Sequence, residues 1–342
     1  MGLLIGVRLQ STIRINMNDL DIYTSSGFKY SRHPEMINAL RNGIGRPQSL
    51  QVALTNRCNL KCVFCSVADR ELKQEWNYVK LILAIDKFIK CNIKTIEFSG
   101  GGEPTLYSKF DKIVNYCRSK GLLLGLITNG LRLKNISPEI LSQFDWIRIS
   151  MVALDYQETI ELPDRFPDNV TIGMSYVVGQ KEYQGKRTYW ESDFEQLMKI
   201  MDYAIKYNAK FIRIVPECFA DENEMNDLHR CYQNLCDTLG HPFLFQPKRQ
   251  KQAEYCYMDA VKPWLHCDGY VYPCNSVSLN TKAIRDFHPG WRICHWEDIE
   301  RYYLDRKNNY LKIAYLCDRC TFTENNKIIK ELIQPIEHED FV

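Results

Sequence analysis

The sequence lacks any hydrophobic run long enough to cross a membrane. The apolar stretch from Leu3 to Val7 near the N-terminus is far too short to span a bilayer. The sequence also lacks an export signal, which would combine a basic segment, a long apolar stretch and a small-residue cleavage site. These two absences predict a cytoplasmic protein with no membrane partner.

Charge of one sign is scarce as well. The 44 Lys and Arg residues nearly balance the 42 Asp and Glu residues and leave a net charge of +2. With 45% hydrophobic residues, this composition excludes a disordered chain and predicts no broad nucleic-acid surface. The 7 histidines include no pair at metal-ligand spacing, so we expect them on the surface or in packing roles.

Cysteine, by contrast, is abundant, with 14 in 342 residues. Cytosolic reductants keep thiols reduced, so some of these residues should be metal ligands. Cys58, Cys62 and Cys65 in TNRCNLKCVFCS have the spacing CxxxCxxC, with no histidine or fourth cysteine nearby in the sequence. Structural zinc uses four ligands, whereas an iron–sulfur cluster held by three cysteines exposes one iron to an exchangeable ligand. A zinc knuckle or incidental buried cysteines are the alternatives.

Strand-like and helical patterns alternate over the larger part of the chain. The predicted strands cover 49–55, 95–100, 122–128, 146–152, 171–178 and 211–217, and the predicted helices 77–91, 107–120, 138–144, 192–205 and 222–239. Successive strand–helix units of this kind predict an α/β fold, with a parallel sheet wound into an open or partial barrel. Catalytic groups in such folds collect where strands end and loops begin.

A glycine-rich turn, SGGGEPT, follows the second predicted strand at residues 99–105. Consecutive glycines let a backbone approach a ligand closely, and the carboxylate of Glu103 can pair with an ammonium group. Alone, such a turn is most often ordinary turn chemistry. It is expected at the same edge of the sheet as the three-cysteine loop, however, and the two together are far more specific.

This pair of motifs resembles the signature of the radical S-adenosylmethionine (SAM) superfamily. Its members combine CxxxCxxC, with an aromatic residue before the last cysteine, with GGEP one strand later, and the resemblance covers about residues 48–217. It implies a partial (β/α)6 TIM-like barrel in which Cys58, Cys62 and Cys65 hold a [4Fe-4S] cluster. The amino and carboxylate groups of SAM would chelate the open iron.

The same resemblance implies a set of cofactor-binding residues. They are Phe64, Gly101, Gly102, Glu103, Pro104, Thr128, Asn129 and Ser150. Glu103 and the glycine backbone would receive the ammonium group of SAM, and Phe64 would lie near its adenine. Ser150 departs from the pattern, because many members have Asp two residues later where this chain has Val152. A serine that merely caps the strand end is the equal alternative.

Past about Gly240 the alternation stops, and aromatics and cysteines suggest a small metal-stapled module. Cys256 and Cys274 flank Gly269 in a C-x12-G-x4-C pattern, and Cys317 and Cys320 form CxxC. Such pairs are typical of a four-sulfur metal site, with zinc as one candidate.

Together with the barrel motifs, this tail resembles the SPASM/twitch subgroup of the superfamily. No cysteine follows Cys320, so the likeness is to the shorter twitch form with one auxiliary [4Fe-4S] cluster. The implied ligands are Cys256, Cys274, Cys317 and Cys320. Cys267 competes with Cys256, and Cys294 is a weaker candidate. The predicted organisation is an N-terminal extension (1–47), a radical SAM barrel (48–240), a twitch module (241–330) and a tail (331–342).

The resemblance implies reductive cleavage of SAM to a 5′-deoxyadenosyl radical and hydrogen abstraction from an unactivated C–H bond. An external one-electron donor such as flavodoxin or ferredoxin would serve the first cluster, and the auxiliary cluster would accept the substrate's electron. Only about 48 residues precede the first strand, fewer than the leader-binding domain of many peptide-modifying members needs. This favours a small-molecule, sugar or nucleoside substrate. A peptide maturase and a non-catalytic zinc or iron–sulfur protein are the alternatives.

Substrate-contacting residues are sought at the strand ends. Arg148, Tyr176, Arg213 and Glu217 lie on or beside the fourth to sixth predicted strands, although rim residues and structural ion pairs are common there. A product with a new carbonyl group needs a base, for which Glu217 and Asp155 are the candidate catalytic residues.

Overall fold

The computed structural model describes residue 23 and residues 27–179, 191–248, 251–281, 286–306 and 310–335. Residues 1–22 and 24–26 of the predicted N-terminal extension lie outside the described residues, as do residues 336–342 of the predicted tail.

One sheet of ten strands organises the described chain, in the order β10-β9-β8-β1-β2-β3-β4-β5-β6-β7. Neighbouring strands from β1 to β7 pair in parallel, which confirms the predicted parallel α/β architecture. These strands are β1 (Ser49–Val52), β2 (Thr95–Phe98), β3 (Leu123–Thr128), β4 (Trp146–Ser150), β5 (Thr171–Val178), β6 (Ile212–Pro216) and β7 (Phe243–Phe245). The parallel series thus runs one short strand further than the sequence predicted.

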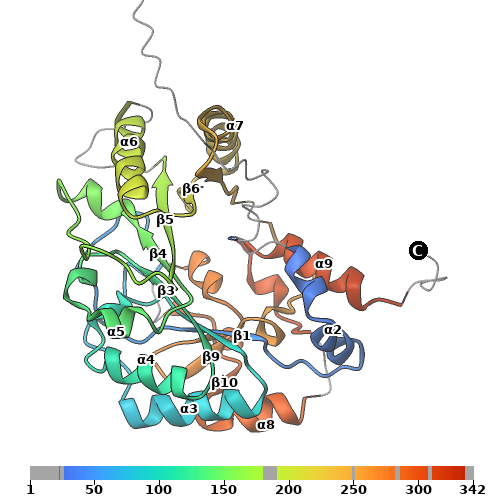
Figure 1. Cartoon of the computed structure of the whole chain (residues 1–342). Coiled ribbons are helices and arrows are strands. Elements are labelled where there is room, and N and C mark those ends of the chain that lie inside the picture. The colour runs from blue at the N-terminus through green and yellow to red at the C-terminus, as the bar shows by residue number, and fades with distance from the viewer. Residues whose placement is uncertain are drawn as a thin grey trace, which may run out of the picture.

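Helices cover the outer face of this curved sheet (Figure 1). They are α3 (Tyr78–Lys90), α4 (Phe110–Ser119), α5 (Pro138–Leu141), α6 (Glu191–Lys206) and α7 (Glu222–Leu239). Side chains begin several of them: Asn77 accepts bonds from the first turn of α3, and Asp221 forms a capping box with Glu224 in α7. Ser137 caps α5 ahead of Pro138, as the sequence predicted.

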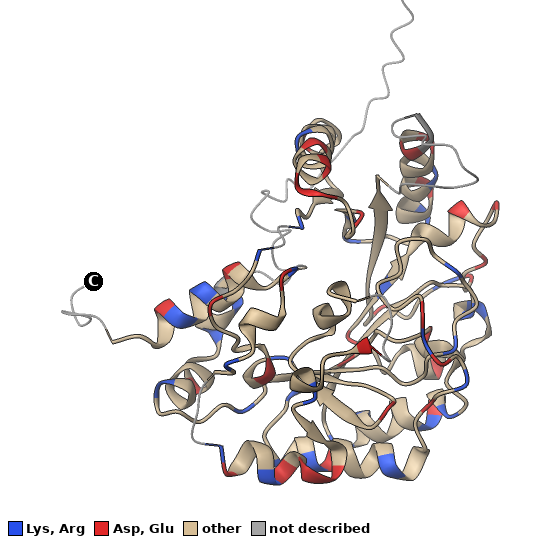
Figure 2. Cartoon of the chain, turned by 180° about the vertical axis from the view of Figure 1, so that it is seen from behind, with Lys and Arg blue, Asp and Glu red and all other residues tan. Residues whose placement is uncertain are grey.

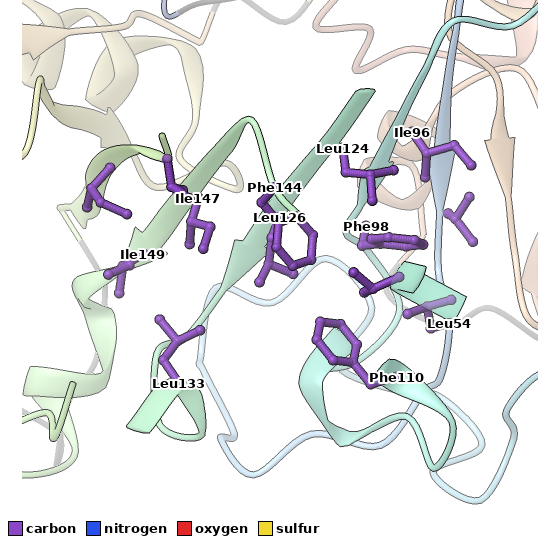
Figure 3. Packing of buried hydrophobic residues seen from close by; sticks show 14 of the residues in the cluster. Leu54, Ile96, Phe98, Phe110, Leu124, Leu126, Leu133, Phe144, Ile147 and Ile149 are labelled. Atoms are coloured by element: carbon purple, nitrogen blue, oxygen red, sulfur yellow. The ribbon is translucent and has the colours of Figure 1, made fainter. Parts of the chain in front are cut away.

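Alternate residues of each strand face the helices and form the main hydrophobic core. In Figure 3, Leu126 of β3 and Ile147 of β4 lie beside Phe144, and Phe110 of α4 lies near Phe98 of β2. The Phe110 and Phe144 rings stack with centroids 6.2 Å apart. Because side chains alternate across a strand, the intervening residues point to the inner face.

The C-terminal part joins the same sheet. β8 (Trp264–Leu265) pairs in parallel with β1 and antiparallel with β9 (Tyr270–Tyr272), which pairs antiparallel with β10 (Cys294–His295). The WLHCDGYVYPC segment is therefore a hairpin. α8 (Ile299–Leu304) packs beside α3, and α9 (Thr323–Ile333) beside α2 (Pro34–Arg41) (Figure 1).

Charged residues of both signs are spread over the outer helices (Figure 2). Glu300 of α8, for example, lies 3.0 Å from Lys90 and 3.6 Å from Lys87 of α3. Exposed pairs of this kind contribute about 0–1 kcal/mol each. No helix in the described ranges is long and apolar enough to span a bilayer.

Leu126 and Leu123 of β3 offer a matched test of the packing. Leu126 is fully buried in the core, whereas Leu123 is 50% exposed. We expect Leu126→Ala to lower the free energy of unfolding by about 2–5 kcal/mol, because it leaves a cavity, and Leu123→Ala to lower it by less than about 1 kcal/mol. Denaturant unfolding measures both, and equal losses would contradict this packing.

Candidate functional site

Three loops meet at the carboxyl edge of the parallel strands: the cysteine loop after β1, the glycine-rich turn after β2 and the TNG turn (Thr128, Asn129 and Gly130) after β3. The first two are in backbone contact, since the Gly102 N–H donates to Thr55 O at 2.7 Å and the Glu103 N–H to Arg57 O at 2.7 Å. A Cβ at Gly102 would lie 2.0 Å from Arg57 O, so only glycine permits this approach. Gly101 adopts φ +67°, which other residues rarely do.

Glu103 joins the turns after β2 and β3. Its side chain is 3% exposed. Oε1 accepts bonds from Thr105 N (3.1 Å), Thr105 Oγ1 (2.7 Å) and Thr128 Oγ1 (2.7 Å), and Oε2 accepts one from Asn129 N (2.8 Å). Burial raises the pKa of Glu103, and these donors act in the opposite direction. The carboxylate therefore fixes the geometry of both turns.

A further bond ties the TNG turn to the cysteine loop. Asn129 Nδ2 donates to Asn59 Oδ1 at 2.7 Å, directly beside Cys58. On the other side, Tyr156 O–H lies 3.3 Å from Val63 N and 3.4 Å from Lys61 O. The predicted cofactor-binding residues Thr128 and Asn129 thus lie at the same edge as the three cysteines.

The three thiols of this loop are only partly buried. Burial, followed by the neighbouring thiols Cys65 and Cys58, raises the pKa of Cys62 to about 12. Burial also raises the pKa of Cys58. The three sulfurs therefore lie close enough to influence one another's charge.

Arg70 is a contact of this loop that the sequence analysis missed. Its Nη1 lies 3.4 Å from Cys65 Sγ, and its Nε donates to Asn56 O at 2.8 Å. A positive charge thus stands beside a predicted cluster ligand. The position of Arg70 just after CxxxCxxC was the available signal, but many arginines follow loops without such a role.

The predicted auxiliary ligands also come together. Burial raises the pKa of Cys256, and Cys274 and Cys320 are among the neighbours that raise it further. Burial also raises the pKa of Cys274, with further contributions from Cys320 and Cys317. Cys267 lies elsewhere, with its Sγ 3.8 Å from Gln74 O. These thiols are thus close enough to influence one another's charge, and Cys267 is not among the groups that act on them. Their role as cluster ligands stays a prediction.

Cys294 is likewise apart from this group, because the charged neighbours that raise its pKa include Asp298, Asp259 and Cys91 but none of the four.

The two cysteine sites share an apolar layer. Cys65, Cys256, Cys274 and Cys317 belong to or pack against one buried cluster that includes Ala53, Val67, Met258, Trp264 and Tyr272.

The three-thiol loop fits a [4Fe-4S] cluster, because three thiolates leave one iron open to an exchangeable ligand. In the described part of the chain, no three His, Cys, Asp or Glu side chains lie at the spacing that a single metal ion requires.

The remaining predicted residues lie at neighbouring strand ends. Phe64 is partly buried, and its carbonyl oxygen accepts a bond from the Cys218 thiol at 3.6 Å. Pro104 begins the short 3-10 helix after Glu103. Ser150 ends β4, and its side chain makes no capping bond to the 3-10 helix that follows. Glu217, just after β6, is 4% exposed and accepts a bond from Phe219 N.

Tyr176 corrects one expectation. It belongs to the core between sheet and helices, and its O–H donates to Asp155 Oδ1 at 2.7 Å. Gln196 of α6 also bonds Asp155, at 3.4 Å. Tyr176 therefore faces the helices and not the substrate side, because its position in β5 has the same parity as the buried Met174.

Comparisons with known proteins agree with this geometry. The family model described as "Radical SAM superfamily" matches residues 52–216. With its two signature loops joined at one edge of a parallel sheet, this part of the chain is similar to that superfamily.

The similar proteins differ in their sequence identity to this chain and in the share of the chain that they cover. A Selenomonas ruminantium S-adenosylmethionine-dependent nucleotide dehydratase is 34% identical over 118 residues, 32% of this chain and 40% of that protein. A Methanococcus maripaludis probable GTP 3′,8-cyclase is 22% identical over 286 residues, 75% of this chain and 93% of that protein. The chain thus spans less than half of the dehydratase.

In structure, the chain resembles Streptococcus suis SuiB bound to precursor peptide SuiA. The TM-score is 0.53 at 15% identity, covering 84% of this chain and 76% of that one. This likeness concerns the fold alone.

Glu103→Gln tests the role of the buried carboxylate. An amide nitrogen in place of one oxygen would face an N–H or O–H donor, so we expect a loss of about 1–3 kcal/mol in stability. Glu161→Gln is the control, because the Glu161 side chain is 75% exposed. Unfolding of both variants followed by circular dichroism measures the difference. Equal stability of the two would contradict the role assigned to Glu103.

Proposed function

We propose that this chain is a radical SAM enzyme that cleaves SAM reductively and abstracts hydrogen from a small-molecule, sugar or nucleoside substrate. The observation that carries this proposal is the joining of the three-thiol loop, the GGEP turn and the TNG turn at one edge. When bound there, a [4Fe-4S] cluster and SAM supply a 5′-deoxyadenosyl radical able to attack an unactivated C–H bond.

The residues of the site divide the work of binding. Cys58, Cys62 and Cys65 are the proposed cluster ligands, and Arg70 offsets the negative charge at Cys65. The Gly101–Gly102 backbone, close to the cysteine loop, leaves room for the amino acid part of SAM. Glu103 both orients the turns and presents negative charge toward the cofactor's ammonium group. Phe64, Pro104, Thr128, Asn129 and Ser150 complete the proposed cofactor site.

We assign Cys256, Cys274, Cys317 and Cys320 as ligands of a second, auxiliary [4Fe-4S] cluster in a twitch module. Four thiolates fill the protein-facing positions of such a cluster. Its place across a shared apolar layer from Cys65 suits an acceptor of the electron left on the substrate. Flavodoxin or ferredoxin would donate the first electron, and a reducing cytoplasm suits the many free thiols.

The substrate class is proposed from the relatives and the site. The dehydratase and the cyclase are named for nucleotide substrates, which favours a nucleoside-type small molecule. Glu217, just after β6, and Asp155, at the end of the 3-10 helix that follows β4, are the candidate bases. SuiB was solved with a precursor peptide, and a peptide-modifying activity is the second candidate.

Counting iron tests the two clusters. The anaerobically reconstituted protein should hold about eight irons, and the triple change of Cys58, Cys62 and Cys65 to Ala about four. Cys256→Ser should lose iron from the auxiliary site, whereas the control Cys267→Ser should keep it, because Cys267 lies apart from the four thiols. Zinc retained in place of iron in the triple variant would overturn the auxiliary cluster.

SAM cleavage tests the activity itself. With dithionite as reductant, the reconstituted protein should form 5′-deoxyadenosine and methionine, detected by chromatography. Cys65→Ala should abolish this cleavage, while Cys267→Ser should retain it. A fully loaded, reduced protein that leaves SAM intact would refute the proposed function.

A further inference from the structure

The inner face of the parallel sheet is polar, unlike its apolar outer face. Strand register places Gln51 of β1 beside Glu97 of β2, and Ser150 of β4 beside Ser175 of β5. Side chains on this face bond one another: Ser49 lies 2.7 Å from Thr95, and Gln51 Nε2 donates to Glu97 Oε1 at 2.8 Å. The same alternation directs Arg148 of β4 and Arg213 of β6 inward, because Ile147, Ile149, Ile212 and Ile214 fill the outer core.

The Nε atoms of Arg148 and Arg213 are buried, and no hydrogen-bond partner for either occurs among the described residues. The Arg148 guanidinium also lies over the Trp146 ring, 5.9 Å from its centroid. Glu97, whose negative charge acts on both, already accepts bonds from Lys262 Nζ at 2.8 Å and from Gln51. One carboxylate thus serves three cations.

Lys248, in the segment after β7, adds a further cation to this group. Burial, then Arg213, lowers the pKa of Lys248 to about 8, and Arg148 acts in the same direction. Burial and the charge of Arg148 lower the pKa of Arg213 as well. Several positive charges placed together in a protein interior cost free energy unless an anion offsets them.

A cavity of about 530 Å³ extends from this region toward the amino ends of the strands. Arg148, Lys262 and Lys29 line it together with Glu97. Its other lining carboxylate, Asp145, is 3.0 Å from Arg118 and also accepts a bond from Leu124 N. Both carboxylates are thus occupied by partners, while the cations remain in excess.

The two arginines lie before the carboxyl ends of their strands, Arg148 ahead of Ser150 in β4 and Arg213 ahead of Pro216 in β6. Because these parallel strands end at the edge that carries the cysteine loop, a ligand held between Arg148 and Arg213 would direct its far end toward the proposed SAM site.

We propose that Arg148 and Arg213 bind an oxyanion group of the substrate, a phosphate or a carboxylate, inside the barrel. This inference rests on the proposed function and narrows its substrate class to anionic small molecules. Guanidinium groups form paired bonds with such oxyanions. The anionic group is the anchor, and the carbon that loses hydrogen lies toward the cysteine loop.

Isothermal titration of the reconstituted protein with inorganic pyrophosphate tests the site, with succinate as the carboxylate probe. We expect one of the two to bind, and Arg148→Met and Arg213→Met to weaken that binding by about tenfold or more. Arg230→Met, whose arginine side chain is 74% exposed, should bind as the wild type does. Preference for pyrophosphate assigns a phosphorylated substrate, and preference for succinate a carboxylated one. No binding of either probe, or unchanged binding in both variants, overturns the proposal.

Thermal unfolding without anion separates a binding role from a structural one. Removing an uncompensated buried cation should raise the melting temperature, so Arg213→Met should be more stable than the wild type while binding less anion. A lower melting temperature would make Arg213 a structural residue and overturn its assignment. SAM cleavage in the wild type is read in parallel: intact cleavage without anion binding refutes this site alone, whereas absent cleavage refutes the proposed function.

Discussion

The buried carboxylate of Glu103 is the interaction on which the site depends. It is 3% exposed and receives donors from both its own turn and the turn after β3. The Asn129–Asn59 bond then carries this constraint to the cysteine loop. Without this charged acceptor, the hydrogen bonds that hold the turns after β2 and β3 in one geometry would be lost. Rigid placement of a cofactor by fixed loops is what radical chemistry requires of the protein.

The rest of the molecule follows from the two faces of one sheet. The outer face carries the aliphatic and aromatic core beneath the helices, whereas the inner face carries Gln51, Glu97, Arg148 and Arg213. A polar interior contributes little to stability, which agrees with the ligand site proposed on this inner face. The C-terminal part extends the same sheet through β8 and brings Cys256, Cys274 and Cys317 to the layer that also contacts Cys65. Site and module thus share one framework.

Much of this arrangement could be predicted from the sequence. The long apolar strands are strong local signals, and the parallel strands lie where those signals indicated. Both cysteine patterns are strong local signals as well, and the ligand sets that they suggest stay predictions. The three residues of β7 were too short to give a pattern. Tyr176 was expected on the substrate side because it lies near a strand end. The alternation of side chains along β5 instead places it on the side that faces the helices. The contact of Arg70 with Cys65 has only a weak sequence signal, its position just after CxxxCxxC, and the separation of Cys267 from Cys256 has none, since it arises from tertiary packing.

The central claim is that three thiolates hold a cluster with one iron open to SAM. Electron paramagnetic resonance of the anaerobically reduced protein, recorded with and without SAM, tests it most directly. The account predicts that SAM alters the signal of one cluster and that this signal is missing when Cys58, Cys62 and Cys65 are changed to Ala. A cluster spectrum that SAM leaves unchanged would contradict the claim.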